Sequence, residues 1–272
     1  MHYNYYFDIC AIFILSTIAI TSLSRRFVPA YRQKAFGCLL FAIFAATIFE
    51  RVETYLQMRP METAWYPLAE KLVGSCYFIA HLASAAAYFM YIMAVLDIYV
   101  SYKEVKSFVM VFFAFFTGLL LVLINWFYPI LFHYDSTGIY HRDNFIYVYY
   151  VLAFYYLFGS IYLMIRYNHL MRVKTRLIIT GYAMFVLFGI IIQFVFPTLL
   201  IENFCNAIST TLIYITLQNP SEMVDESLNI LNRKAFIDSL NLSIKRKSTH
   251  YTIFVTIDNI RALSSEIGYA QS

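Results

Sequence analysis

Several charged and amide side chains stand inside long apolar runs of this 272-residue sequence, where each is energetically costly unless it has a partner or a function. Glu202 and Asn206 are four residues apart and Glu50 and Glu53 three apart, so each pair shares one helix face. Carboxylates, an imidazole and amides in apolar surroundings can orient a small polar molecule. The candidate ligand-binding residues are Glu50, Arg51, His81, Trp126, Gln193, Glu202, Asn203 and Asn206.

Two interpretations of these residues stay open. They satisfy one another, with Arg51 pairing with Glu50, Glu53 or Glu202, or they line a pocket for a small ligand. All fall toward one side of the expected spans, and Asp97 alone falls near the other. This one-sided pattern favours a cavity closed below over a channel or pump, which needs polar groups through the whole depth.

The composition indicates that these residues sit in membrane-spanning helices. The chain is 61% hydrophobic and 13% charged, whereas soluble domains have about 45–50% apolar and about 25% charged residues. A soluble globular enzyme is therefore excluded for most of the chain. Seven segments are long and apolar enough to cross a bilayer: 5–23, 35–55, 72–99, 108–127, 145–167, 177–196 and 199–217.

The positive charges predict the orientation of these spans. The loops after the first, third and fifth spans hold ten Lys and Arg residues, and the alternate loops hold four. Because positively charged loops stay in the cytoplasm, the N-terminus is expected outside and the C-terminus inside. This orientation explains the net charge of +4 without a nucleic-acid-binding surface, so we expect a lipid bilayer and no nucleic acid as partner.

The composition changes at 218–220, where Pro220 ends the seventh run. An amphipathic helix is predicted over 223–247, a strand over 251–257 and a short helix ending at Gly268. The expected fold is an all-α membrane bundle followed by the start of an α/β domain. The predicted domains are a transmembrane domain over 1–219 and a cytoplasmic fragment over 220–272.

Two motifs of the tail resemble GGDEF domains, the diguanylate cyclase family. In the first, 225–236, the matching residues are Asp225, Asn232, Arg233 and Phe236; in the second, 256–269, they are Asp258 and Gly268. The resemblance implies a membrane-bound signalling protein of the cyclic di-GMP type and a homodimer. It places the chain in a bacterial inner membrane.

The same motifs depart from the family at functional positions. Thr256 stands where the family has a metal-binding Asp, and a hydroxyl is a weaker Mg²⁺ ligand than a carboxylate. Ser264 stands at the guanine-binding Asn, and the chain ends at Ser272 before the GGDEF turn. We therefore expect no catalysis, catalytic residue, metal site or cofactor in the chain as given, since Mg²⁺ and GTP would need a complete domain. A fragment of a longer protein is the favoured explanation.

Together these patterns predict a transmembrane receptor. It would bind a small ligand from outside the cell and signal to the cytoplasmic tail. The alternative is a transporter or scaffold with a vestigial regulatory tail. Transporters usually show paired Gly or Pro interruptions near mid-membrane, whereas Gly118, Gly159, Gly181 and Gly189 are scattered.

Overall fold

The fold is taken from a computed structural model, which divides the chain into two compact units, Met1–Ala235 and Phe236–Ser272. The structure describes residues 3–24, 31–58, 65–96, 98, 105–135, 140–217, 224–225, 230–245, 251 and 253–255. The division between the units falls sixteen residues after the predicted domain boundary at 219, inside a helix of the tail.

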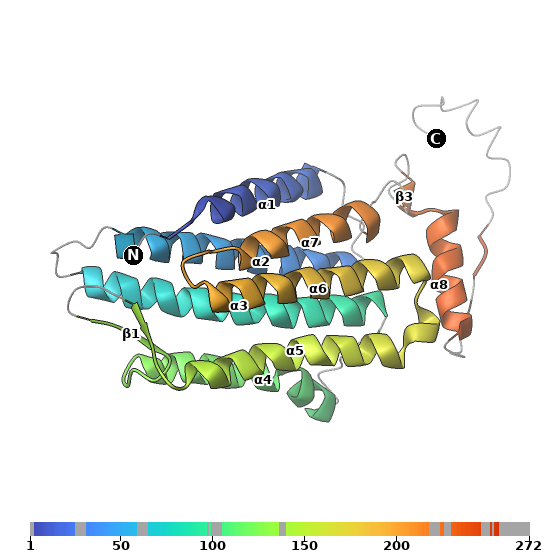
Figure 1. The fold of residues 1–272 in the computed structure, drawn as a ribbon. Coiled ribbons are helices and arrows are strands. Elements are labelled where there is room, and N and C mark those ends of the chain that lie inside the picture. The colour runs from blue at the N-terminus through green and yellow to red at the C-terminus, as the bar shows by residue number, and fades with distance from the viewer. Residues whose placement is uncertain are drawn as a thin grey trace. The chain divides into compact units, whose positions relative to one another are not determined.

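The described part of the first unit is a bundle of seven α-helices that run side by side (Figure 1). A single 3₁₀ turn, Asn168–Leu170, joins the fifth helix to the sixth. The helices are α1 (Tyr6–Ser24), α2 (Tyr31–Met58), α3 (Tyr66–Val95), α4 (Val105–Asn125), α5 (Ile146–Arg166), α6 (Val173–Val195) and α7 (Glu202–Leu217).

Six of these helices, α1 to α6, are long and apolar enough to cross a membrane. The multi-pass membrane architecture predicted from composition is therefore confirmed. The seventh predicted span is the exception, because α7 begins only at Glu202 and has 16 residues, or about 24 Å of helix at ~1.5 Å per residue. Leu199 to Ile201, which the hydropathy assigns to that span, precede the helix in a non-helical connection.

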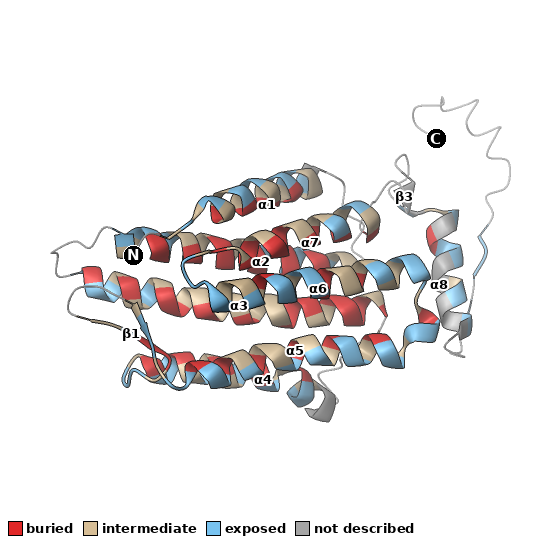
Figure 2. Ribbon diagram, in the orientation of Figure 1, coloured by how far each residue is buried: buried red, intermediate tan, exposed pale blue. Residues whose placement is uncertain are grey.

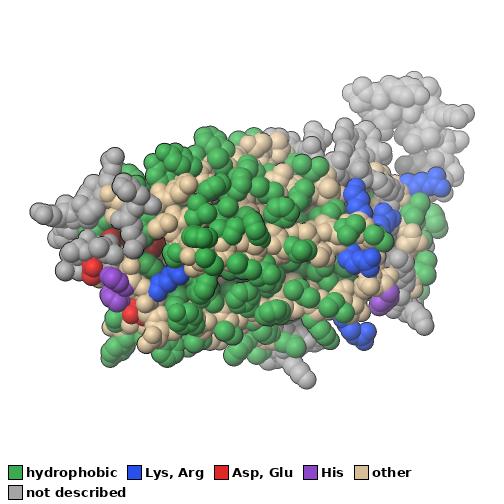
Figure 3. Space-filling view, in the orientation of Figure 1, with side chains coloured by type: hydrophobic (Ala, Val, Ile, Leu, Met, Phe, Trp, Pro, Cys, Tyr) green, Lys and Arg blue, Asp and Glu red, His purple; other side chains and the backbone are tan. Residues whose placement is uncertain are grey.

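The bundle core is aromatic and is centred on α3. Phe78 of α3 stacks on Phe132 and meets Tyr149 of α5 edge-on, each at a ring-centroid distance of 5.0 Å. Figure 2 shows buried residues concentrated on α2, α3 and α7, whereas α4, α5 and α6 turn exposed faces outward. Those outward faces are apolar (Figure 3), as expected for helices surrounded by lipid.

A small β-hairpin closes one end of the bundle. Strands β1 (Phe132–Tyr134) and β2 (Tyr140–Arg142) pair antiparallel, with His133 opposite His141. Asn125, at the end of α4, holds the start of the hairpin. Its Oδ1 accepts the Ile130 and Leu131 N–H groups at 2.8 Å, and its Nδ2 donates to the Phe132 carbonyl at 3.1 Å. The polar Asn125 near the predicted fourth span is thus a structural residue. We call the end of the bundle that the β1–β2 hairpin closes the hairpin end.

The tail differs from the prediction. The helix expected over 223–247 is shorter, because strands β3 (Val224–Asp225) and β4 (Ile230–Leu231) form a two-residue hairpin before α8 (Arg233–Lys245). Asn232 marks the actual start of α8, since its Oδ1 accepts the Ala235 N–H at 3.1 Å, which is an N-cap contact. The strand expected over 251–257 is not formed at Tyr251 or over 253–255, so no α/β domain is evident in the described residues.

We predict that Gly118→Ala will weaken the contact between α3 and α4. A Cβ atom at Gly118 would lie 2.2 Å from Cδ2 of Leu82, a side chain that is almost fully buried, and overpacking of this kind costs about 1–3 kcal/mol. Thermal unfolding in detergent measures the change. Gly37→Ala is the control, because its Cβ meets nothing within 4 Å; an equal loss of stability in both variants would contradict the prediction.

Candidate functional site: a buried polar cluster beside a cavity

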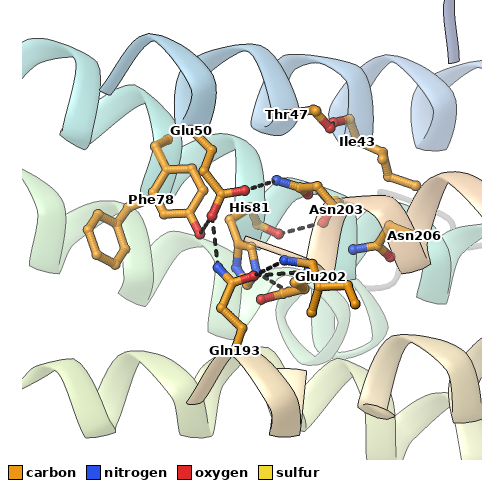
Figure 4. A network of polar contacts seen from close by, with 12 residues as sticks. Ile43, Thr47, Glu50, Phe78, His81, Gln193, Glu202, Asn203 and Asn206 are labelled. Atoms are coloured by element: carbon orange, nitrogen blue, oxygen red, sulfur yellow. Dashed lines mark hydrogen bonds and ion pairs between the residues drawn. The ribbon is translucent and has the colours of Figure 1, made fainter. Parts of the chain in front are cut away.

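Glu50 of α2 is the centre of a buried polar cluster (Figure 4). Its Oε1 accepts the side-chain amide of Gln193 of α6 at 2.8 Å, and its Oε2 accepts that of Asn203 of α7 at 2.6 Å. The Tyr77 hydroxyl of α3 donates to Oε1 at 3.4 Å. One carboxylate therefore collects donors from three helices, which compensates its removal from water.

Gln193 also fixes the start of α7. Its Oε1 accepts the backbone N–H groups of Ile201 and Glu202 at 3.0 and 2.9 Å. The first N–H groups of a helix have no partner within the helix, so this side chain caps α7 from a neighbouring helix. The same residue thus connects the Glu50 carboxylate to the first turn of α7.

His81 of α3 and Glu202 of α7 form the second contact to that turn. The His81 Nε2 and Glu202 Oε1 atoms are 2.6 Å apart, and both side chains are close to 90% buried. One turn farther along α7, the Tyr182 hydroxyl donates to Asn206 Oδ1 at 3.2 Å. The first two turns of α7 are therefore bonded through their side chains to α2, α3 and α6.

Glu53 is a second carboxylate, one turn from Glu50 toward the hairpin end. Its Oε1 accepts the Tyr134 hydroxyl of β1 at 2.8 Å and the Gln57 amide at 3.3 Å. Burial, together with the nearby Glu53 carboxylate, raises the pKa of Tyr134 and that of Tyr140 well above the ordinary value. Both phenols therefore stay protonated, and Tyr134 serves as a donor to Glu53.

Part of this cluster faces a cavity of about 790 Å³, which we call the main cavity and which is within the usual size of small-molecule sites. Its floor carries Glu50, Glu53, His81, Gln193 and Glu202, and its walls come from α3, α5, α6 and the hairpin. Much of the wall is aromatic: Tyr3, Tyr77, Phe78, Tyr140, Tyr147, Tyr150, Phe154 and Phe194.

A smaller cavity of about 60 Å³ adjoins the main cavity at the His81–Glu202 pair. The two cavities share His81, Tyr150, Phe154, Ile190 and Glu202 as lining residues. Asn206 and the stacked rings of Tyr88 and Tyr182, with centroids 4.1 Å apart, also line the smaller one. A volume of this size holds a few water molecules at most. The His81–Glu202 pair therefore lines both the main cavity and this smaller one, which we call the inner extension.

The structure brings together six of the eight residues predicted to bind a ligand. Glu50, His81, Gln193 and Glu202 line the main cavity, Asn206 lines its inner extension, and Asn203 bonds to Glu50 without lining either. Trp126 lies elsewhere, against α3, where its carbonyl accepts the Lys71 ammonium at 2.6 Å. Ligand binding by any of the eight stays a prediction.

Arg51 also lies outside the cavity lining. Among the described residues it forms no salt bridge to Glu50, Glu53 or Glu202, the pairings expected for it. Its guanidinium instead lies over the Tyr5 ring, 4.3 Å from the centroid, and close to the fully buried Asp8. The sequence order explains this placement, because Arg51 follows Glu50 directly and neighbouring helical residues point in different directions.

In comparisons with known proteins, no family model, no curated protein and no solved structure matches this chain. The resemblance to GGDEF domains therefore has no support beyond the two motifs.

Within the first motif, Asp225 lies in β3, Asn232 caps α8, Arg233 begins α8 and Phe236 is half exposed on it. The matching residues of the second motif, Asp258 and Gly268, lie outside the described residues. A capping role by itself accounts for the asparagine of the first motif. The described tail thus holds no feature that requires a nucleotide-binding domain.

Several cavity residues escaped prediction from sequence. Tyr140, His141 and Arg142 of β2 lie in a segment between two apolar runs, and only the fold of the hairpin brings them over the cavity. The aromatic wall carried no distinguishing signal, because the chain has 25 Tyr and 26 Phe. Glu53 shares a helix face with Glu50 and lines the cavity, but it was not among the eight predicted residues.

We predict that Gln193→Leu will destabilise the bundle by about 3 kcal/mol. It removes the acceptor of two partly buried N–H groups and a donor to Glu50, and each of these three groups left unsatisfied costs ~1 kcal/mol at the low end of the usual range. Chemical or thermal unfolding in detergent measures the loss. Gln57→Leu is the matched control, because Gln57 makes a single long bond to Glu53. Equal stabilities of the two variants would show that Gln193 does not hold α7.

Proposed function

We propose that this protein is a multi-pass membrane receptor that binds a small ligand in the main cavity and signals through α7 to its tail. The observation that carries the proposal is that the polar groups facing the cavity are the groups that hold the first turn of α7. Glu202 contributes a side chain to the lining, and Gln193 contributes its amide while capping the helix. A ligand that competes for these groups changes the restraints on α7.

We infer that α7 is the seventh span. At the hairpin end Asn4 pairs with Leu199, next to the start of α1, and at the other end the Arg32 guanidinium donates to the Leu217 carbonyl. Arg32 belongs to the first turn of α2, so residues 199–217 extend along the bundle from the level where α1 begins to the level where α2 begins.

The distribution of charge supports an external hairpin end. Arg166, Arg172, Lys174 and Arg176 gather where α5 ends and α6 begins, and Figure 3 shows basic side chains concentrated there, away from the hairpin. By the positive-inside rule this end faces the cytoplasm. The proposal places the cavity on the extracytoplasmic side and the tail inside, in a bacterial inner membrane as the first motif suggests.

The closed inner end favours a receptor over a transporter. Beyond the stacked Tyr88 and Tyr182, the buried residues from Tyr91 to Ala94 of α3, and Leu96 just after the helix, carry no charged side chain. A transport path needs polar or wet groups on both sides of its binding site. A transporter or scaffold with a regulatory tail is the alternative that the experiment below addresses.

The proposed output of the receptor is the tail that follows α7. Residues 218–223 connect α7 to the β3–β4 hairpin, and the first motif follows directly. A GGDEF-type output is a hypothesis supported by six matching residues in two motifs, and a homodimer follows only from that resemblance. Coupling through α7 itself needs neither, since it depends on the bonds at the first turn of the helix.

We predict that a compound stabilising the purified protein will also change hydrogen exchange in the tail. The protein in nanodiscs is screened by thermal unfolding, since a ligand that binds the folded state raises the midpoint. Amide exchange over residues 230–245 is then compared with and without the hit. A receptor shows altered exchange there, and Glu202→Gln reduces both the stabilisation and the altered exchange.

The alternatives give different results. A transporter moves the same compound across proteoliposomes without changing exchange in the tail. Tyr182→Phe is a control for Glu202→Gln, because it removes the hydrogen bond to Asn206 and leaves the lining residues of the main cavity unchanged. An absence of stabilising compounds, with Glu202→Gln destabilised on its own, would mean that the cluster is purely structural.

A further inference from the structure

We propose that the ligand of the main cavity is an apolar organic cation, an amine carried on an aromatic or aliphatic body, which enters from the lipid between α5 and α6. This inference rests on the proposed function and specifies the ligand class of the same site. Three features of the cavity carry it: the charge of its floor, the chemistry of its walls and the position of its opening.

The floor has more negative than positive groups. Glu50, Glu53 and Glu202 face the cavity, and within the described part of the chain no Lys or Arg lies within salt-bridge distance of any of them. His81 is the single partner with a positive form, and it is bonded to Glu202. Asp8, buried next to Glu50, adds a further acid on the far side and has Arg51 near it.

The hydrogen bonds show that Glu50 and Glu53 act as acceptors. Amides of Gln193 and Asn203 donate to Glu50, and the Tyr134 phenol donates to Glu53. Such neutral donors stabilise a carboxylate without cancelling its charge. Two carboxylates with neutral partners, at the wall of a cavity that a molecule can enter, favour a cationic guest over an anionic one.

The walls fit the same guest. Aromatic rings from α3, α5, α6 and the hairpin surround the floor, and the faces of such rings attract ammonium groups. Tyr140 keeps its proton, because burial and the nearby Glu53 raise its pKa, so its phenol is neutral and does not form a competing charge. An amine held by carboxylates below and rings around it would have both of its favoured partners.

The opening indicates an apolar body. Val151 of α5 and Ile191 of α6 line the cavity, yet their exposed fractions are 64% and 54%, so they lie at its mouth on the side of the bundle. Tyr147 and Phe194 combine the same two properties. All four belong to helices that are long and apolar enough to cross a membrane and whose exposed residues are largely apolar, so a guest using this mouth passes through lipid.

Arg142 and His141 are basic residues, which would favour an anionic guest over a cationic one. Both line the cavity from β2, both are exposed, and Arg142 lies close to Tyr140 at the hairpin end. An anionic guest would use them and avoid the carboxylates. The three acids hold the deeper position, whereas Arg142 and His141 belong to the exposed rim, so the cation is favoured; the anion is the alternative outcome of the test.

The test uses three probes with one apolar body and different end groups: 4-phenylbutylamine, 4-phenylbutanol and 4-phenylbutanoate. Binding to the full chain in phosphatidylcholine nanodiscs is measured at pH 7 by titration calorimetry and thermal unfolding. The amine is expected to bind at least tenfold more tightly than the alcohol and the acid. Butylamine, which lacks the ring, is expected to bind more weakly than 4-phenylbutylamine.

Variants locate the interaction. Glu50→Gln and Glu53→Gln are each expected to reduce amine affinity at least tenfold, and Glu70→Gln, a buried acid outside the cavity lining, is expected to leave it unchanged. Thermal unfolding without ligand verifies that each variant is folded. If Glu50→Gln is not folded, Glu53→Gln alone tests amine binding. Ile191→Trp at the mouth is expected to slow association of the amine relative to Phe188→Trp, an exposed residue of α6 outside the lining.

The outcomes separate this inference from the proposed function. Tighter binding of the acid, or equal binding of all three probes, overturns the cation class, while a different stabilising compound that alters exchange in the tail leaves the receptor proposal intact. Amine binding that survives both Glu→Gln variants also overturns the inference. Equal association rates in Ile191→Trp and Phe188→Trp overturn the entry through lipid.

Discussion

A carboxylate in the middle of an apolar bundle is the constraint on which the rest of this structure depends. Glu50 cannot leave its helix, so the neighbouring helices must supply donors to it, and they do so through Gln193, Asn203 and Tyr77. Supplying them fixes the rotation of α6 and α7 about their axes. The same geometry brings Glu202 to His81, so the position of α7 follows from the hydrogen bonds that a buried carboxylate requires.

The cavity is a consequence of that arrangement. Next to the side chains that gather around Glu50, residues of α5, α6 and the hairpin line an open space that they do not fill. The hairpin is itself held from inside, by Asn125 at its base and by the bond from Tyr134 to Glu53. The groups that stabilise the fold and the groups that face the cavity are therefore largely the same groups.

Much of this could be predicted from the sequence, for physical reasons. Six helices were predictable because a long apolar run has a single stable form in lipid. The meeting of Glu50, His81 and Glu202 was indicated because all three fall at one depth. The partner of Arg51 could not be predicted, because the depth of a residue in the membrane does not determine the direction in which its side chain points. The cavity wall could not be either, because aromatic residues are too common here to mark a site.

The tail shows the opposite case, where local patterns predicted more order than the structure has in its described residues. A capping asparagine delays the start of α8 to Arg233, and a two-residue hairpin takes the place of the first predicted turns. Short motifs specify local turns well and domains poorly, because a domain needs a hydrophobic core larger than local turns provide.

We expect occupation of the cavity to move α7, and a distance measurement tests this most directly. Spin labels at Ile215 of α7 and Ile165 of α5, both exposed, report the separation of the two helices at the end opposite the hairpin. The labels are placed in a background without the four native cysteines, and the distance is measured by pulsed electron resonance in nanodiscs. We expect the distribution of distances between the two labels to shift when a stabilising compound saturates the protein. An unchanged distribution, with binding verified by thermal unfolding of the same sample, would contradict it.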